Sequence, residues 1–300
     1  MRFRAICVAL ALAALPACSA GDGSESDGRL RVVAAFYPLE YAVARVGGSD
    51  VDVDGLTRPG TEPHDLELTP RQAAAIGDAD LVVHLAGLQP AVDDAVAQQA
   101  PDASLDVAAV QPLERGYVAI EEGELHEDAG GVDPHFWLDP TRYARVVDAI
   151  AERLAAVDAD GADGYRSRAA ELVAELASLD RDLAAGLRTC ARRELVTSHN
   201  AFGYLARAYD LEQVGITGLT PEDEPTPARL AQVVELARKR RVTTVFFEEL
   251  VSPKVAEALA AEIGARAEVL TPLESAPESG GYFDAMRSNL AALRTALGCS

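Results

Sequence analysis

Strand-like segments alternate with helical segments along most of the chain, and this alternation limits the folds open to it. The strand-like segments, several of them apolar and rich in β-branched residues, lie at 29–36, 51–56, 80–85, 194–197, 211–216, 242–247 and 267–270. The expected helices lie at 39–46, 71–76, 140–157, 202–208, 227–239, 253–263 and 282–297. Strands that are apolar on both faces are typical of parallel sheets covered by helices. The pattern therefore predicts an α/β protein with mainly parallel sheets.

One long amphipathic segment, 164–189, divides the two blocks of alternation. Its apolar stripe, at three- and four-residue steps, is formed by Leu172, Leu176, Leu179, Leu183 and Leu187. At 1.5 Å per residue such a helix is roughly 37 Å long, enough to cross a whole domain. We therefore expect an N-terminal lobe at 29–160, a connecting helix at 161–189 and a C-terminal lobe at 190–300, with any shared site in the cleft between the lobes.

Residues 1–17 are typical of an export signal. Arg2 and Arg4 precede an apolar stretch of about ten residues, which is too short to span a bilayer as a helix. The sequence LPAC, which ends at Cys18, is a bacterial lipobox and predicts that Cys18 becomes the lipidated mature N-terminus. Residues 18–28 are rich in Gly, Ser and Asp and predict a flexible tether to the extracellular face of the cell membrane.

The chain is strongly acidic. Its formal net charge is −21, and it becomes −23 without residues 1–17, which hold two arginines and no acid. A surface of this charge excludes nucleic acid as a partner and favours cations.

Two cysteines, Cys190 and Cys299, remain once the signal is removed and Cys18 carries lipid. In an oxidising exterior an even number of cysteines favours a disulfide over two free thiols. We therefore expect these two to be bonded.

Polar residues with metal-binding side chains follow three of the predicted strands. His64 comes after the strand at 51–56, His199 after 194–197 and Glu274 after 267–270. Ligands of open parallel sheets bind beyond the carboxyl ends of the strands, so these residues have a reason to face one cleft. Three imidazoles, with His135 included, and one carboxylate form a closed tetrahedral shell that suits Zn²⁺.

His135 lies in the loop VDPHFWLDP, where prolines restrict the backbone and acids stand on both sides, at Asp133 and Asp139. An acid can orient a ligand imidazole through its other nitrogen, and Asp139 is our candidate for that role. Glu248, at the end of the strand at 242–247, is a second candidate or a simple surface acid. His84 lies in an apolar strand and is expected to be a core residue. His126, among five acids, is either a solvated loop residue or a weak cation-collecting site.

Sequence motifs of common enzymes are missing: there is no HExxH, GxSxG, Walker or GxGxxG motif. Four protein ligands also leave no open position on zinc for a substrate or water. Binding is therefore favoured over catalysis. Two alternatives stay open: a lipid-anchored zinc metallohydrolase with Glu248 as base, and an adhesion or interaction protein in which metal is structural.

Six motifs, taken together, are highly specific: GTEPHDLELTP, DPHFWLDP, TSHNAFGYLA, GLTPEDEPTPARL, FFEELVSPKVAEALA and LTPLES. With them the chain resembles, over nearly all of 29–298, the metal-specific solute-binding lipoproteins of bacterial ABC importers. This zinc/manganese cluster is also called the adhesin or cluster A-I family.

The resemblance implies two α/β lobes joined by one long rigid helix, with metal held between them by His64, His135, His199 and Glu274. Manganese-type members are similar but carry an acid where His199 stands, so zinc is expected, with a manganese-binding member as the alternative. The implied function is capture of extracellular zinc by a monomer and its delivery to the membrane subunit of an ABC permease.

This chain departs from the family pattern in two places. The loop before the second ligand is short and acidic, with only His126, where zinc members often have a long histidine-rich loop. Thr271 stands near the position where many relatives have an aspartate. Because LTPLESAPESGG combines prolines with paired glycines, we expect a mobile loop there and a weaker contribution to zinc binding from Glu274 than from His199.

Overall fold

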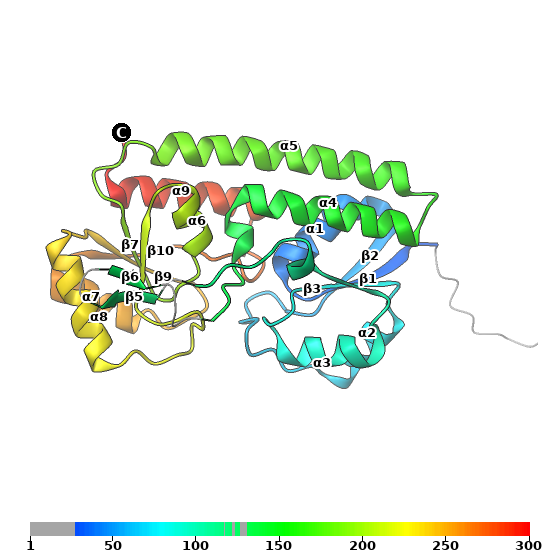
Figure 1. The fold of residues 1–300 in the computed structure, drawn as a ribbon, viewed down its shortest axis with the longest axis horizontal. Coiled ribbons are helices and arrows are strands. Elements are labelled where there is room, and N and C mark those ends of the chain that lie inside the picture. The colour runs from blue at the N-terminus through cyan, green and yellow to red at the C-terminus, as the bar shows by residue number, and fades with distance from the viewer. Residues whose placement is uncertain (1–27, 117, 122–123, 127–130) are drawn as a thin grey trace, which may run out of the picture.

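Two four-stranded sheets form the framework of the protein (Figure 1). The structure, a computed structural model, describes residues 28–116, 118–121, 124–126 and 131–300. The predicted export signal, the lipidated Cys18 and nearly all of the tether lie outside these residues. Within the part that the structure describes, no helix is both long enough and apolar enough to cross a membrane.

The first sheet has the strand order β2-β1-β3-β4, and every neighbouring pair is parallel. Its strands are β1 (Leu30–Ala34), β2 (Val51–Gly55), β3 (Leu81–His84) and β4 (Ser104–Asp106). Its connecting helices are α1 (Tyr37–Gly47), α2 (Pro70–Asp78) and α3 (Pro90–Gln99), with short 3-10 helices at η1 (Gly48–Asp50) and η2 (Val107–Ala109). α2 begins at Pro70, and Thr69 before it forms a capping box with Gln72 in the first turn. The sequence did not predict α3 or β4.

The second sheet has the order β10-β9-β7-β8 and is also parallel throughout. Its strands are β7 (Glu194–Thr197), β8 (Glu212–Gly215), β9 (Thr244–Phe247) and β10 (Arg266–Val269). Its helices are α6 (Gly203–Ala208), α7 (Pro227–Lys239), α8 (Lys254–Ile263) and α9 (Tyr282–Leu297). The prediction of mainly parallel sheets with helical connections is confirmed.

The long helix α5 (Ala162–Leu187) joins the two halves. It runs beside α4 (Pro140–Val157) and α1 at one end and reaches α9 at the other (Figure 1). All the leucines of its predicted stripe are buried. The connecting helix is thus present as expected, while the lobe limits at 29–160, 161–189 and 190–300 stay predictions.

A short antiparallel hairpin, β5 (Val118–Glu121) and β6 (Glu124–His126), occupies the acidic segment before His135. The hairpin lies near β8 of the second sheet. The side chains at 117–130 are not among those that the structure describes, so the prediction that His126 is a solvated residue or a weak cation-collecting site lies outside the described part.

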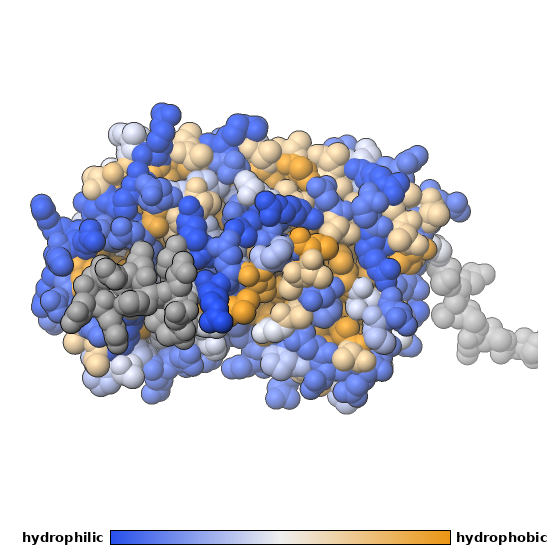
Figure 2. Space-filling view, viewed as in Figure 1, coloured by the Kyte–Doolittle hydropathy of each residue, from blue (hydrophilic) through white to orange (hydrophobic). Residues whose placement is uncertain are grey.

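One large hydrophobic core extends from the first sheet through α4 and α5 to α6 and α9, and a smaller core lies between the second sheet and α7 and α8. Trp137, in the 3-10 helix η3 (Phe136–Leu138), is fully buried and lies 5.0 Å from the ring of Phe36. The loop that carries His135 is therefore fixed within the core. On the face in Figure 2 most of the surface is hydrophilic, with apolar residues exposed in scattered patches.

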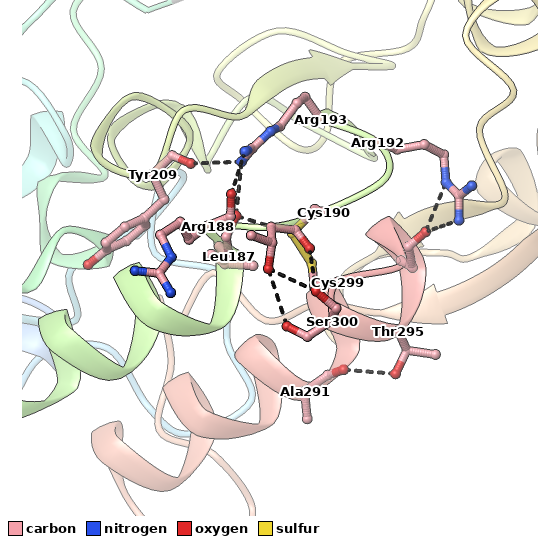
Figure 3. Close-up of a disulfide and its surroundings, with 12 residues drawn as sticks. Leu187, Arg188, Cys190, Arg192, Arg193, Tyr209, Ala291, Thr295, Cys299 and Ser300 are labelled. Atoms are coloured by element: carbon pink, nitrogen blue, oxygen red, sulfur yellow. Dashed lines mark hydrogen bonds between the residues drawn. A yellow bond between two sulfur atoms is a disulfide. The ribbon is translucent and has the colours of Figure 1, made fainter.

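A disulfide joins Cys190, just after α5, to Cys299, just after α9 (Figure 3). α9 ends at Leu297, and Gly298 caps it with a left-handed φ of 65° directly before Cys299. Nearby, Arg193 donates hydrogen bonds to the carbonyls of Leu187 and Arg188 at the end of α5. The predicted disulfide is confirmed.

Candidate metal centre

All four predicted metal ligands lie together between the two sheets. One ligand atom from each of His64, His135, His199 and Glu274 lies within 4.8 Å of the others. The Oε1 atom of Glu274 is at the centre of the group, 2.8 Å from Nε2 of His135 and 3.4 Å from Nε2 of both His64 and His199. Three imidazoles and one carboxylate therefore converge on a volume the size of a metal ion.

Loops at the carboxyl ends of parallel strands place three of these residues. His64 follows β2, and its loop is held by Gln89, whose side-chain amide donates to the carbonyl of Pro63 at 3.1 Å. His199 follows β7, where the Thr197 hydroxyl donates to the His199 carbonyl at 2.6 Å.

Glu274 follows β10 in a loop that is anchored rather than loose. Leu273 adopts a left-handed φ of 58°, and Trp137 donates from Nε1 to the carbonyl of Pro272 at 2.7 Å. Glu274 itself is only 2% exposed. This burial argues against our expectation of a mobile loop with a replaceable carboxylate.

Each of the two fully buried histidines is oriented by an acid. Asp133 Oδ1 accepts hydrogen bonds from the backbone N–H of His135 at 3.0 Å and from its Nδ1 at 2.8 Å. Glu248 Oε1 lies 2.5 Å from Nδ1 of His199 and also accepts from the hydroxyl of Ser198. With Nδ1 so engaged, the Nε2 atoms are left to face Glu274 and a metal.

Asp139 does not take the orienting role that the sequence suggested. Its Oδ1 accepts from the backbone N–H of Thr141 at 2.9 Å and caps α4, and its Oδ2 lies 3.4 Å from Nε of Arg142. An aspartate directly before a proline at the first helical position is placed to cap the helix, so the ring partner of His135 is Asp133 instead.

Burial and charge act in opposite directions on the pKa values of the site. Burial alone would lower the pKa of His135 and of His199, but the carboxylates of Asp133 and Glu248, together with Glu274, raise both above the usual value. Burial would raise the pKa of Glu274, yet hydrogen bonds from the three histidines hold it well below the usual value. A cation that binds here must compete with protons for the rings.

Glu62 is a site residue that the sequence analysis missed. Its Oε1 accepts from the backbone N–H of His64 at 2.8 Å and lies 4.0 Å from Nε2 of that ring. Burial and the charge of Glu274 raise the pKa of Glu62 to about 8. The sequence does contain a pattern that points to Glu62: both Glu62 and Asp133 stand two residues before a histidine, with a proline between. In the structure each of these acids accepts a hydrogen bond from the backbone N–H of that histidine.

Comparison with known proteins gives consistent matches. A family model described as "Zinc-uptake complex component A periplasmic" matches residues 32–296. The chain is 34% identical to the high-affinity zinc uptake system protein ZnuA of Bacillus subtilis (strain 168), over 98% of this chain and 95% of that protein. It is 35% identical to the zinc-binding lipoprotein AdcA of Streptococcus pneumoniae (strain ATCC BAA-255 / R6), over 93% of this chain and 58% of that protein, so it spans little more than half of AdcA.

Solved structures agree with this pattern. The laminin-binding protein Lmb of Streptococcus agalactiae is similar with a TM-score of 0.80 and 30% identity, over 89% of this chain and 99% of that one. Zn(II)-bound AdcA from Streptococcus pneumoniae is similar with a TM-score of 0.76 and 33% identity, over 90% of this chain and 58% of that one.

Proposed function

Because this chain belongs to the family of periplasmic zinc-uptake components, which its match over residues 32–296 shows, we propose that His64, His135, His199 and Glu274 bind its zinc. As a family member it is the extracytoplasmic zinc-binding component of a zinc uptake system. The observation that carries the proposal is the convergence of three imidazoles and one carboxylate within 4.8 Å. In this role zinc is cargo, bound outside the cell and released for import.

Zinc is favoured over manganese by the donor set. Imidazole nitrogens bind Zn²⁺ more tightly than Mn²⁺ in the divalent-metal affinity order, whereas manganese sites are rich in oxygen ligands. Here three of the four proposed donors are nitrogens. Asp133 and Glu248 add support, since carboxylates at Nδ1 increase the basicity of the ligand nitrogens.

The partners follow from the family. Its members deliver zinc to an ABC permease, and we assign this chain the same role as a monomer tethered to the extracellular face of the cell membrane through lipid on Cys18. The lipobox ending at Cys18 supports the anchor, and the pneumococcal relative AdcA is named a lipoprotein.

We assign the protein no catalytic activity. Four side-chain ligands complete a tetrahedral zinc shell, so no position remains for a water nucleophile. Glu248, the base that a hydrolase would need, is engaged with Nδ1 of His199 and the hydroxyl of Ser198.

Metal reloading tests the proposal directly. Purified protein is stripped with a chelator, reloaded from an equimolar mixture of zinc, manganese and other divalent metals, and the bound atoms are counted by native mass spectrometry. We expect one zinc per chain, and none in a variant with both His135 and His199 replaced by alanine. Predominant loading with manganese would overturn the choice of metal, and full zinc loading of the double variant would overturn the choice of ligands.

A further inference from the structure

A cluster of charged and aromatic side chains lies behind the His135 loop, on the side away from the ligand nitrogens. The guanidinium carbons of Arg142 and Arg207 each lie 4.9 Å from the centre of the Tyr204 ring. Glu114 links the two arginines, since one of its oxygens pairs with Arg142 and the other lies 2.9 Å from Nε of Arg207. The ring of Tyr204 thus packs against two cations that share one acid.

Tyr204 also fixes the chain on both sides of this cluster. Its hydroxyl accepts from the backbone N–H of Glu114 at 2.7 Å and donates to the carbonyl of Asp133 at 2.9 Å. Tyr204 is 1% exposed, so both bonds are shielded from water. The position of the Asp133 backbone therefore depends on a side chain from α6.

Asp133 is the link to the metal centre. It is fully buried, and its Oδ1 holds both the backbone and the ring of His135. Its Oδ2 lies 3.8 Å from Nη2 of Arg207. A buried carboxylate is costly unless a positive charge or hydrogen bonds compensate it, and Arg207 supplies a positive charge on the side opposite to His135.

The cluster connects the segments that carry two different ligands. Tyr204 and Arg207 belong to α6, which follows the His199 loop, whereas Asp133 stands two residues before His135. The Nε2 atoms of His135 and His199 are 3.4 Å apart. A change in how α6 holds Asp133 would therefore change both the aim of the His135 ring and its distance from His199.

We propose that Arg207 and Tyr204 are positioning residues for zinc binding: they hold Asp133 so that Nε2 of His135 faces the metal beside His199. This inference rests on the proposed zinc site. The contact that links both residues to the ligands is Asp133, which holds the backbone and the ring of His135. Positioning groups of this kind change metal affinity by about 10- to 100-fold when removed.

Arg142 offers a matched control. It lies at the same distance from Tyr204 as Arg207 and pairs with the same Glu114, but its further acidic contact is Asp139, the cap of α4, and not Asp133. Arg207→Met should raise the Kd for zinc by about 10- to 100-fold. Arg142→Met should leave it within about threefold, because the acids that Arg142 pairs with, Glu114 and Asp139, do not contact His135.

The experiment compares wild type, Arg207→Met, Arg142→Met and Arg207→Lys in the full chain. Zinc affinity is measured by competition with a chromophoric chelator, and the visible absorption of the Co²⁺-loaded proteins reports the ligand geometry. We expect a weaker Kd and an altered Co²⁺ spectrum only in Arg207→Met. Arg207→Lys, which keeps a cation near Asp133, should recover most of the affinity.

Thermal unfolding of the chelator-treated variants separates positioning from stability. Similar melting temperatures for Arg207→Met and Arg142→Met with different zinc affinities support the proposal. If Arg207→Met does not fold, Tyr204→Phe takes its place, because it removes only the hydroxyl that binds the Asp133 carbonyl and should also weaken zinc binding. Equal effects of both methionine variants on Kd, or a wild-type Kd and Co²⁺ spectrum in Arg207→Met, would overturn it. Failure of the wild type to bind zinc would instead refute the proposed function.

Discussion

Replacement of Glu248 tests how much of the zinc affinity comes from a side chain that never contacts the metal. Glu248 is 3% exposed, and one of its oxygens serves both Nδ1 of His199 and the hydroxyl of Ser198. In Glu248→Gln an amide oxygen can still accept both bonds, so only the negative charge is lost. Charge-assisted hydrogen bonds are roughly twice as strong as neutral ones, which predicts a loss of about 1.4 kcal/mol, or tenfold in Kd. Glu248→Ala removes both bonds and should cost about 100-fold.

The neighbouring Glu249→Gln is the control, because it makes the same change of charge on an exposed side chain. In chelator competition at pH 8, wild type and Glu249→Gln should have the same, lowest Kd for zinc. The Kd should be higher in Glu248→Gln and highest in Glu248→Ala. The gap between wild type and Glu248→Gln should narrow toward pH 6, because Glu248 raises the pKa of His199 and so also favours the competing proton. Equal Kd values for the two glutamine variants would refute this account of the His199 ring.

Four further predictions concern pH (two of them), the fourth ligand and the disulfide. Zinc affinity, measured by chelator competition, should fall as the pH drops from 8 to 6, starting above the usual histidine value of about 6.5 because the pKa of both His135 and His199 is raised; an unchanged Kd over this range would contradict it. The same raised pKa values stabilise the zinc-free fold below about pH 6.5, and this stability is lost as the pH rises through the folded-state pKa. The melting temperature of the zinc-free protein should therefore fall as the pH is raised above about 6.5, whereas that of the zinc-loaded protein should rise. Glu274→Ala should weaken zinc binding at least as much as His199→Ala in isothermal titration, since Oε1 of Glu274 contacts all three rings, whereas a Kd within about threefold of wild type would favour the mobile loop. Alkylation without reduction should label neither Cys190 nor Cys299 in peptide maps, and their joint replacement by alanine should lower stability by at most about 4–5 kcal/mol, the chain-entropy figure for closing a loop of 109 residues.

The helices and strands could be predicted wherever the pattern of apolar residues is long enough to show a helical or strand period. The stripe of α5 and the apolar strands of both sheets gave the architecture, and α4, α7 and α9 begin and end where expected. β4 has only the three residues Ser104–Asp106, all half-buried, so it carries neither an apolar run nor an alternation. α3 was missed although Pro90 marks its first turn.

Three of the four proposed ligands could be proposed from topology, but the residues that support them could not. His64 follows a strand of the first sheet, and His199 and Glu274 follow strands of the second. Parallel sheets bind ligands beyond the carboxyl ends of their strands, so a site between the two sheets could be expected from the chain path. Whether Asp133 or Asp139 orients the His135 ring depends on the local backbone. Pro140 starts α4, and the Asp139 side chain caps that helix, so Asp133 is left to bind the ring. Arg207 and Tyr204 meet Asp133 only through folding, across more than 70 positions of sequence, and no local pattern announces such a contact.

The distribution of burial among the ligands indicates where zinc exchanges with solvent. The side chains of His135 and His199 are fully buried and that of Glu274 is 2% exposed, whereas that of His64 is 9% exposed. The core shared by both sheets and the disulfide between α5 and α9 hold the more buried three in one frame. The His64 loop instead reaches the second half through an exposed hydrogen bond from the Gly60 N–H to the Ser275 hydroxyl, at 2.8 Å. Because exposed contacts open at lower cost than buried ones, we expect the site to open first on the His64 side, beside Glu62. A variant Ser275→Ala, which removes this hydrogen bond, should release zinc to a chelator faster than wild type in stopped-flow measurements, and an unchanged release rate would contradict this expectation.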